Sequence, residues 1–273
     1  MRAGLNLGIG SRRKGGAVAA PAAISTTGLF TRFTSAFSTL TTTTDAQGRT
    51  VVTQMNDMIA SANAVSSGTE HPVRMVDEQG RTFLRYNSLS WMAFVTASAI
   101  NYQSNCIYFV GRMHRPSNLN SGVTNVLYLT GYSTHAHMNV APTNTTPFLR
   151  MVNGNTQNNT GREKMIAGSQ MQVLVTRSNG SSGSAISVGV NQDILTIGGF
   201  AAAGSGLGGQ IGAANGTGNL GGFDLYEVAV YTSGFSNTDI NGTVPGDPVN
   251  GGNVGKLMAY YNIAPITRSI ALE

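Results

Sequence analysis

The sequence predicts an all-β protein built as an antiparallel β-sandwich. Short runs of apolar, aromatic and β-branched residues recur along the chain, and clusters of Gly, Asn, Ser and Thr separate them. Glycine alone numbers 35 in 273 residues, as a fold with many turns requires. Charged residues make up 11% of the chain and hydrophobic residues 41%. This balance argues against disorder, and the length allows one large sandwich with a sizeable core.

The candidate strands follow one another with turn residues between them. Two strands flank a turn at residues 78–80, and the clearest hairpin joins residues 171–177 to residues 185–190. We find no repeat at a fixed period, which argues against a solenoid. The other predicted strands are residues 91–99, 106–112, 125–130, 148–153, 194–197 and 222–231, and the predicted loops are residues 115–122, 153–161, 178–183 and 201–219.

Helix is expected only near the C-terminus. A helical turn should begin at Ser236, whose hydroxyl can form a capping box with Asp239. A short helix is expected over residues 253–262, because four apolar residues there follow i, i+3, i+4, i+7 spacing. These four residues are Val254, Leu257, Met258 and Tyr261.

The net charge of +5 is concentrated at the N-terminus. Residues 1–44 contain basic residues and no acid, whereas the remainder carries 12 basic and 12 acidic residues. We therefore predict an extended basic, Gly/Ala-rich arm over residues 1–25 and one domain over residues 26–273, with no specific nucleic-acid site on the domain. A partner-anchoring arm and an unordered tail both stay open. The candidate anchoring residues are Arg2, Arg12, Arg13 and Lys14.

Cysteine content and hydropathy exclude several classes of protein. Cys106 is the single cysteine, so no intrachain disulfide forms, and we interpret it as a small core residue rather than a nucleophile. No apolar run approaches the length of a transmembrane helix. The first residues do not resemble a signal peptide, because the basic cluster comes late and the following segment is weakly apolar. We expect a protein made in the cytoplasm and not secreted.

No constellation of residues predicts catalysis. The segment Gly204–Gly209 matches G-x-G-x-x-G by letter, but no helix is expected after it, so we interpret it as a Gly-rich surface loop. Glycan hydrolysis needs two carboxylates that converge on one bond. Asp224 and Glu227 are three residues apart, which places them on opposite faces of a regular strand. The expectation is that the protein is not an enzyme and has no catalytic residues.

Metal, cofactor and sugar sites have weak signals. His135 and His137 share one face of a strand, but no third ligand lies nearby, so we expect no metal site and no cofactor. Trp91 and Tyr226 are candidates for stacking on sugars, although a lone Trp in an apolar run is more often a core residue. Five N-x-S/T triplets reflect the abundance of Asn, Ser and Thr in loops. They begin at Asn144, Asn158, Asn179, Asn215 and Asn241.

Three segments carry a resemblance to a known family over most of residues 26–263. The C-terminal strand and turn resemble the end of laminin-G-like, concanavalin-A-like jelly rolls, through Glu227, Val228, Val230, Tyr231, Phe235, Ser236, Asp239 and Ile240. A second segment is similar to the opening of laminin-G-like domains found in bacteriophage particles, through Asp45, Gly48, Arg49, Val51 and Asp57. A third resembles the exposed turn of the family, at residues 190–192.

The resemblance implies a non-enzymatic structural protein of the bacteriophage virion, as a capsid decoration, spike or tail component. Its lectin-like sandwich would face outward for adhesion or assembly, after synthesis in the host cytoplasm. The implied partners are other virion proteins held through the arm, further copies of the chain, and a host-surface glycan, with no membrane. The alternatives are a free carbohydrate-binding lectin-like module and, less favoured, a glycan hydrolase.

Overall fold

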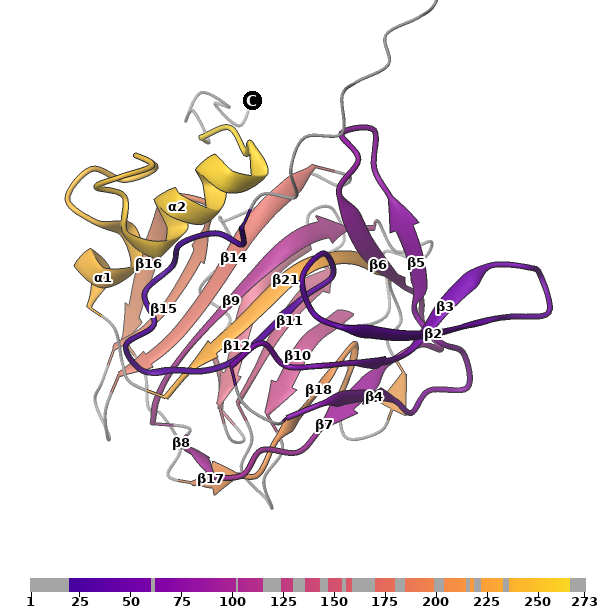
Figure 1. Ribbon diagram of the computed structural model, residues 1–273. Coiled ribbons are helices and arrows are strands. Elements are labelled where there is room, and N and C mark those ends of the chain that lie inside the picture. Colours follow the sequence, from indigo (N-terminus) through magenta and orange to yellow (C-terminus); the bar gives the residue numbers. More distant parts are fainter. Residues whose placement is uncertain are drawn as a thin grey trace, which may run out of the picture.

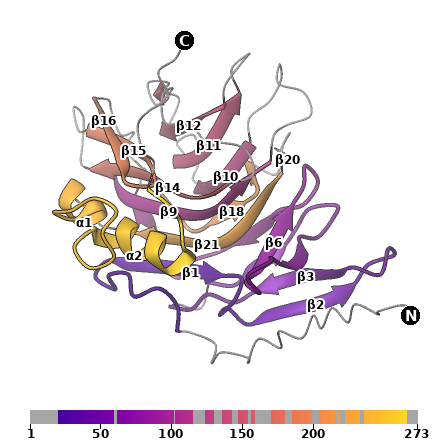
Figure 2. The ribbon, with the colours of Figure 1, turned by 90° about the horizontal axis from the view of Figure 1, so that it is seen from above.

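A computed structural model of the protein shows the predicted β-sandwich, with two short helices on one outer face (Figure 1). Two antiparallel sheets pack face to face, and the helices form a third layer (Figure 2). The fold class expected from the sequence is therefore confirmed. The structure describes residues 20–59, 62–101, 103–114, 124–129, 136–142, 147–153, 156–158, 170–179, 185–198, 204–214, 217–218, 222–232 and 236–265.

The sheet beneath the helices, here the helix-side sheet, is built on three long strands. These are β9 (Ser104–Met113), β14 (Met171–Asn179) and β21 (Phe223–Tyr231). Strand β9 lies between β14 and β21. On its other edge β21 pairs first with β6 and then with β1. The remaining strands are β1 (Leu29–Thr34), β5 (Val73–Val76), β6 (Thr82–Tyr86), β15 (Ala185–Val190) and β16 (Asp193–Gly198).

The opposite sheet consists of shorter strands and joins the helix-side sheet at β3 (Thr50–Met55), which pairs with both β4 and β5. Its order from β3 is β4, β7, β18, β10, β11, β12 and β13, with β2 on the other side of β3. These strands are β2 (Leu40–Thr44), β4 (Ala64–Ser66), β7 (Met92–Phe94), β10 (Thr124–Leu129), β11 (Ala136–Pro142), β12 (Pro147–Asn153), β13 (Thr156–Asn158) and β18 (Gly209–Ile211). Two separate strand pairs complete the β-structure: β8 (Ile100–Asn101) with β17 (Ser205–Gly206), and β19 (Ala213–Ala214) with β20 (Thr217–Gly218).

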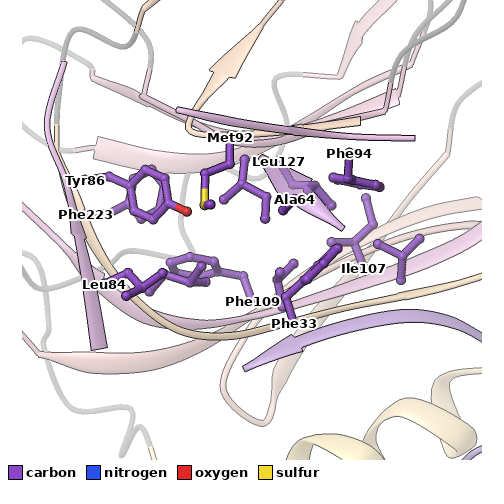
Figure 3. Packing of buried hydrophobic residues seen from close by; sticks show 14 of the residues in the cluster. Phe33, Ala64, Leu84, Tyr86, Met92, Phe94, Ile107, Phe109, Leu127 and Phe223 are labelled. Atoms are coloured by element: carbon purple, nitrogen blue, oxygen red, sulfur yellow. The ribbon is translucent and has the colours of Figure 1, made fainter. Parts of the chain in front are cut away.

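The main core fills the space between the sheets. Met92, Phe94 and Leu127 from the opposite sheet face Phe33 and Phe109 from the helix-side sheet (Figure 3). Large aromatic rings dominate this layer because they remove the most apolar surface from water. The Phe33 and Phe94 rings lie 5.3 Å apart, and this contact joins the two sheets.

A second cluster covers the outer face of the helix-side sheet. It contains Tyr226, Tyr231 and Cys106 from the strands, together with residues of helices α1 (Asn237–Asn241) and α2 (Gly252–Tyr261). Helix α2 buries the apolar stripe that its spacing predicted: Val254, Leu257, Met258 and Tyr261. The buried position of Cys106 confirms its interpretation as a core residue, and burial raises its thiol pKa to about 12.

The chain enters the domain through this second cluster. Ala22 and Ile24 are buried there, and the Tyr231 hydroxyl donates to the Ser25 carbonyl at 2.7 Å. The Ser25 amide in turn donates to the Asn253 side chain on α2. Residues 22–25 are thus part of the packed outer layer. The predicted anchoring residues Arg2, Arg12, Arg13 and Lys14 lie outside the described residues.

The Gly-rich segment predicted as a surface loop contains an interior strand, so that interpretation is wrong. Strand β18 lies between β7 and β10, and Ile211 is fully buried in the main core. Glycine makes this approach sterically accessible. A Cβ on Gly208 would lie 2.1 Å from the Phe94 carbonyl oxygen, and one on Gly212 would lie 2.9 Å from the Tyr86 ring.

Two further expectations are corrected by packing. The strand predicted over residues 91–99 forms only as β7 and ends at Phe94, because the chain turns before β8, where the Thr96 hydroxyl donates to the Ser98 carbonyl. The turn expected to be exposed at residues 190–192 is buried at Asn191. This residue has φ 52° and hydrogen-bonds Val173 with both its backbone amide and its side-chain oxygen. The Asn191 side chain thus ties the β15–β16 turn to β14.

The predicted capping box at Ser236 is confirmed. The Asp239 amide donates to the Ser236 hydroxyl oxygen, and the Ser236 amide donates to the Asp239 carboxylate. Helix α2 ends at Asn262, which adopts the left-handed conformation typical of a helix C-terminus. No helix within the described part of the chain is long and apolar enough to cross a membrane.

Candidate ligand-binding surface

A β-bulge in β21 controls which side chains reach the outer face of the helix-side sheet. The pairing of β21 with β9 shifts register between Leu225 and Glu227, which makes Tyr226 the extra residue. Asp224, Tyr226 and Glu227 therefore all lie on the outer face. The expectation that Asp224 and Glu227 occupy opposite faces was wrong, because alternation applies only to an unbroken ladder. Ser35 supports the bulge: its amide and hydroxyl both donate to the Tyr226 carbonyl.

Glu227 is enclosed beneath α2. Its carboxylate accepts hydrogen bonds from the Arg32 guanidinium and, at 2.8 Å, from the Tyr261 hydroxyl. Burial raises the Glu227 pKa, and the nearby Arg32 charge opposes this shift. Arg32 also donates to the Ala22 carbonyl. These contacts fasten β1, β21, α2 and the N-terminal segment together, and they leave the Glu227 carboxylate without access to a solvent-borne substrate.

Asp224 occupies the other end of the bulge and carries two basic partners. Arg85 Nε and Nη2 donate to its two carboxylate oxygens at 2.8 and 3.1 Å, and His114 Nε2 lies 3.0 Å from Oδ1. Burial alone would raise the Asp224 pKa, but the hydrogen bonds from His114 and Arg85 outweigh burial and lower it. The carboxylate is therefore an ionised anchor that orients Arg85 and His114.

A second buried carboxylate, Asp77, holds two more arginines near the same strand. It bonds Arg81 Nε at 2.8 Å and the Tyr226 hydroxyl at 3.1 Å, and Arg112 Nη2 lies 3.7 Å away. The guanidinium groups of Arg81 and Arg112 lie 5.5 and 5.7 Å from the centroid of the Tyr226 ring, as cation–π contacts do. We call Arg85, Arg112 and His114 the cationic row, because Arg85 on β6 and Arg112 on β9 both pair with Asp224 of β21 and His114 directly follows β9.

A partly exposed tryptophan, Trp91, lies between the end of β6 and the start of β7, where two loops meet. Trp91 precedes β7, and its carbonyl accepts hydrogen bonds from the amides of Ser67 and Gly68. A Cβ on Gly68 would lie 2.9 Å from Trp91 Cδ1, so the absence of a side chain at Gly68 lets the indole lie against this loop. Leu89, half exposed, extends the apolar surface. The interpretation of Trp91 as a core residue is thus wrong, because the residue sits at the rim and not between the sheets.

Polar side chains lie on the same two loops. Asn87 Nδ2 donates to Glu70 Oε2 at 2.6 Å, and the Leu89 amide donates to Asn87 Oδ1. Ser66 Oγ lies 2.7 Å from His71 Nδ1. Glu70 Oε1 and His71 Nε2 make no hydrogen bond with any described residue. We name the surface formed by Trp91, Glu70, His71, Asn87 and Leu89 the Trp91 rim.

The Trp91 rim and the cationic row are neighbours. A Cβ on Gly222 would lie 3.0 Å from His114 Nδ1 and 3.7 Å from Asn87 Cα. The backbone of Gly222 therefore lies between His114 of the cationic row and Asn87 of the Trp91 rim. The His114 amide donates to the Gly222 carbonyl and fixes this spacing. The loop that carries Asn87 thus meets the end of β9 at the backbone of Gly222.

The other predicted sites are not brought together. Tyr226, predicted as a sugar platform, is buried and stacked 5.3 Å from the Phe83 ring. His135 and the side chain of His137 lie outside the described part of the chain. No group of three or more His, Cys, Asp or Glu residues among the described positions is arranged to hold a metal ion. The sequence missed the Trp91 rim because its residues come from two loops, and proximity between loops has no spacing signal.

Comparisons with known proteins identify the fold. No protein-family model and no curated protein matches the chain. Among solved structures, the binding domain of Paraclostridial Mosquitocidal Protein 1 is similar over 78% of this chain and 50% of that chain, with a TM-score of 0.53 and 10% identity. The binding domain of botulinum neurotoxin DC in complex with SialylT is similar over 78% and 50%, with a TM-score of 0.51 and 8% identity.

An enzyme shares the same architecture. An α-L-arabinofuranosidase soaked with a cyclic sulfate inhibitor is similar over 70% of this chain and 49% of that chain, with a TM-score of 0.52 and 11% identity. The protein therefore has the concanavalin-A-like sandwich fold found in toxin binding domains and in a glycosidase. The chain spans about half the length of each of these proteins. At such low identity the likeness establishes the fold, and function rests on the site.

Proposed function

We propose that the protein is a lectin-like binding module that recognises a glycan through the Trp91 rim. The carrying observation is the partly exposed Trp91 on loops that also carry the hydrogen-bonding groups of Glu70, His71 and Asn87. The apolar face of a pyranose ring can stack on an indole, while its hydroxyls need nearby donors and acceptors. Loops held by a rigid sandwich are a frequent location for recognition residues. The complex of the botulinum neurotoxin DC binding domain with SialylT supports this choice.

We further propose that the module binds its glycan without cleaving it. The two acids nearest each other in β21 are each committed to structural contacts: Asp224 to Arg85 and His114, and Glu227 to Arg32 and Tyr261. A hydrolase needs one carboxyl group to protonate the leaving oxygen and a second to act as base or nucleophile on the same bond. Release of reducing ends from a bound glycan, lost in Asp224→Asn, would refute the non-enzymatic assignment.

Binding is tested with an array of immobilised glycans, followed by calorimetric titration of the tightest ligand. We expect Trp91→Ala to weaken binding about thirtyfold, since a central aromatic contact contributes about 2 kcal/mol. Trp91→Phe should keep part of the affinity because a ring remains. Val249→Ala is the matched control, because Val249 is an exposed apolar residue in the segment before α2. Equal binding by wild type and Trp91→Ala would refute the assignment of the rim.

Attachment to a bacteriophage particle is a second proposal and rests on the sequence. The whole charge excess lies before residue 45, which fits an arm that contacts a particle while the near-neutral domain faces outward. Residues 22–25 pack on the domain, so the informative truncation removes residues 1–19 only. We expect this truncated protein to fold and to lose co-sedimentation with particles. Normal occupancy on the particle would refute the anchoring role.

A further inference from the structure

The cationic row holds two guanidinium groups and an imidazole near the surface and the carboxylates beneath them. The side chains of Arg85, Arg112 and His114 are 42%, 28% and 32% exposed, whereas those of Asp224 and Asp77 are 2% exposed. A ligand approaching the outer face therefore meets guanidinium and imidazole groups before it meets a carboxylate. The exposed acid nearest in sequence, Glu78, lies in the turn beyond Asp77.

The three basic residues differ in how much of their hydrogen-bonding capacity is occupied. Arg85 gives two donors to Asp224, and this bidentate contact fixes the plane of its guanidinium. The Arg112 side chain makes no hydrogen bond with any residue that the structure describes. Its separation of 3.7 Å from Asp77 is an ion pair beyond hydrogen-bond distance, and its other contact is the Tyr226 ring. Arg112 is thus positioned by charge and by an aromatic face while its N–H donors stay available.

We propose that Arg112, with Arg85 and His114 beside it, binds the oxyanion of an acidic glycan. The chemistry is a planar fork of N–H donors, which matches a carboxylate and also accepts a sulfate group. Gly222 brings His114 next to Asn87, whose loop leads into Trp91, so the proposed ligand extends along this loop from Trp91 to the cationic row. This inference rests on the proposed lectin-like function and specifies the ligand class.

The test compares neutral, sialylated and sulfated forms of one glycan core, using the whole chain. We expect at least tenfold tighter binding of one acidic form than of the neutral form, with affinity falling as salt is raised. Arg112→Gln should abolish this preference and leave binding of the neutral form unchanged. The sialylated and sulfated arms distinguish a carboxylate ligand from a sulfate ligand. Circular dichroism checks the variant fold, which should persist because Arg81 and Tyr226 still hold Asp77.

The matched control is Arg74→Gln, which removes the same charge from an exposed arginine. Arg74 pairs with Leu84 of the main core, whereas its neighbour Val73 pairs with Arg85, so Arg74 leaves β5 on the other face. If Arg112→Gln and Arg74→Gln weaken binding of the acidic form equally, the preference comes from the overall charge of the protein, and the inference is overturned. Trp91-dependent binding with no acidic preference would overturn it and leave the lectin-like function standing. The absence of binding to any form would refute both.

Discussion

Gly208→Ala should destabilise the protein by about 4 kcal/mol, because Gly208 lets β18 enter the opposite sheet. The Cβ would lie 2.1 Å from the Phe94 carbonyl oxygen and 2.9 Å from Val95 Cα. Backbone atoms cannot rotate away, so the β7–β18 ladder must open. Losing two or three of its hydrogen bonds costs about 1 kcal/mol each. The positive φ of 118° adds roughly 1–2 kcal/mol for a residue with a side chain.

The matched control is Gly80→Ala. Gly80 also has a positive φ, of 79°, but nothing lies within 4 Å of its Cβ position, so only the conformational cost of about 1 kcal/mol applies. Urea unfolding followed by fluorescence and circular dichroism measures both variants. With a slope of about 3 kcal/mol per molar urea, the midpoint should fall by more than about 1 M for Gly208→Ala. Equal midpoints for the two variants would refute the claim that close backbone approach requires glycine at position 208.

Three other predictions concern charges and caps. Glu227→Gln should lower the free energy of unfolding by about 3 kcal/mol, because it leaves the buried Arg32 without its counter-charge. Tyr261→Phe should lower it by about half as much, since it removes one hydrogen bond to Glu227. Urea unfolding that shows no loss of stability for Glu227→Gln would contradict this. The Asp224 pKa is lowered below its unfolded value of 3.8, so its contribution to the free energy of unfolding should be complete above about pH 4 and lost as the pH falls through the native pKa. Urea unfolding at pH 5 and at pH 3 measures this loss of stability, and Asp224→Asn should make the loss smaller. Ser236→Ala should cost about 1 kcal/mol and speed amide exchange in α1, whereas unchanged exchange would show that the capping box is dispensable.

The elements predicted best from the sequence are those whose secondary structure and burial follow from their own residues. Helix α2 was predicted within one residue of each bound, because the spacing of Val254, Leu257 and Met258 places all three on one face of a helix and on no single face of a strand. Strand β21 was predicted equally well, since its apolar and β-branched residues dominate nine consecutive positions that are all buried.

The errors share one physical cause: the deciding partner lies far away in the sequence. Gly209 has low strand propensity, and only the presence of β7 and β10 on either side makes β18 a strand. The bulge at Tyr226 depends on Ser35, almost two hundred residues earlier in the chain. The Trp91 rim and the cationic row combine residues from separate loops and strands, and a single sequence carries no signal for such proximity.

The position of β21 has a consequence for synthesis of the chain. This strand lies between β9 on one side and β6 and β1 on the other, yet among the described strands it is the last to leave the ribosome. Until then, long edges of β1, β6 and β9 have no partner, and such edges invite pairing with other chains. Folding must therefore wait for contacts of high sequence separation, which makes it slow. Yield in the cell should depend on chaperones and temperature more than on the stability of the finished sandwich.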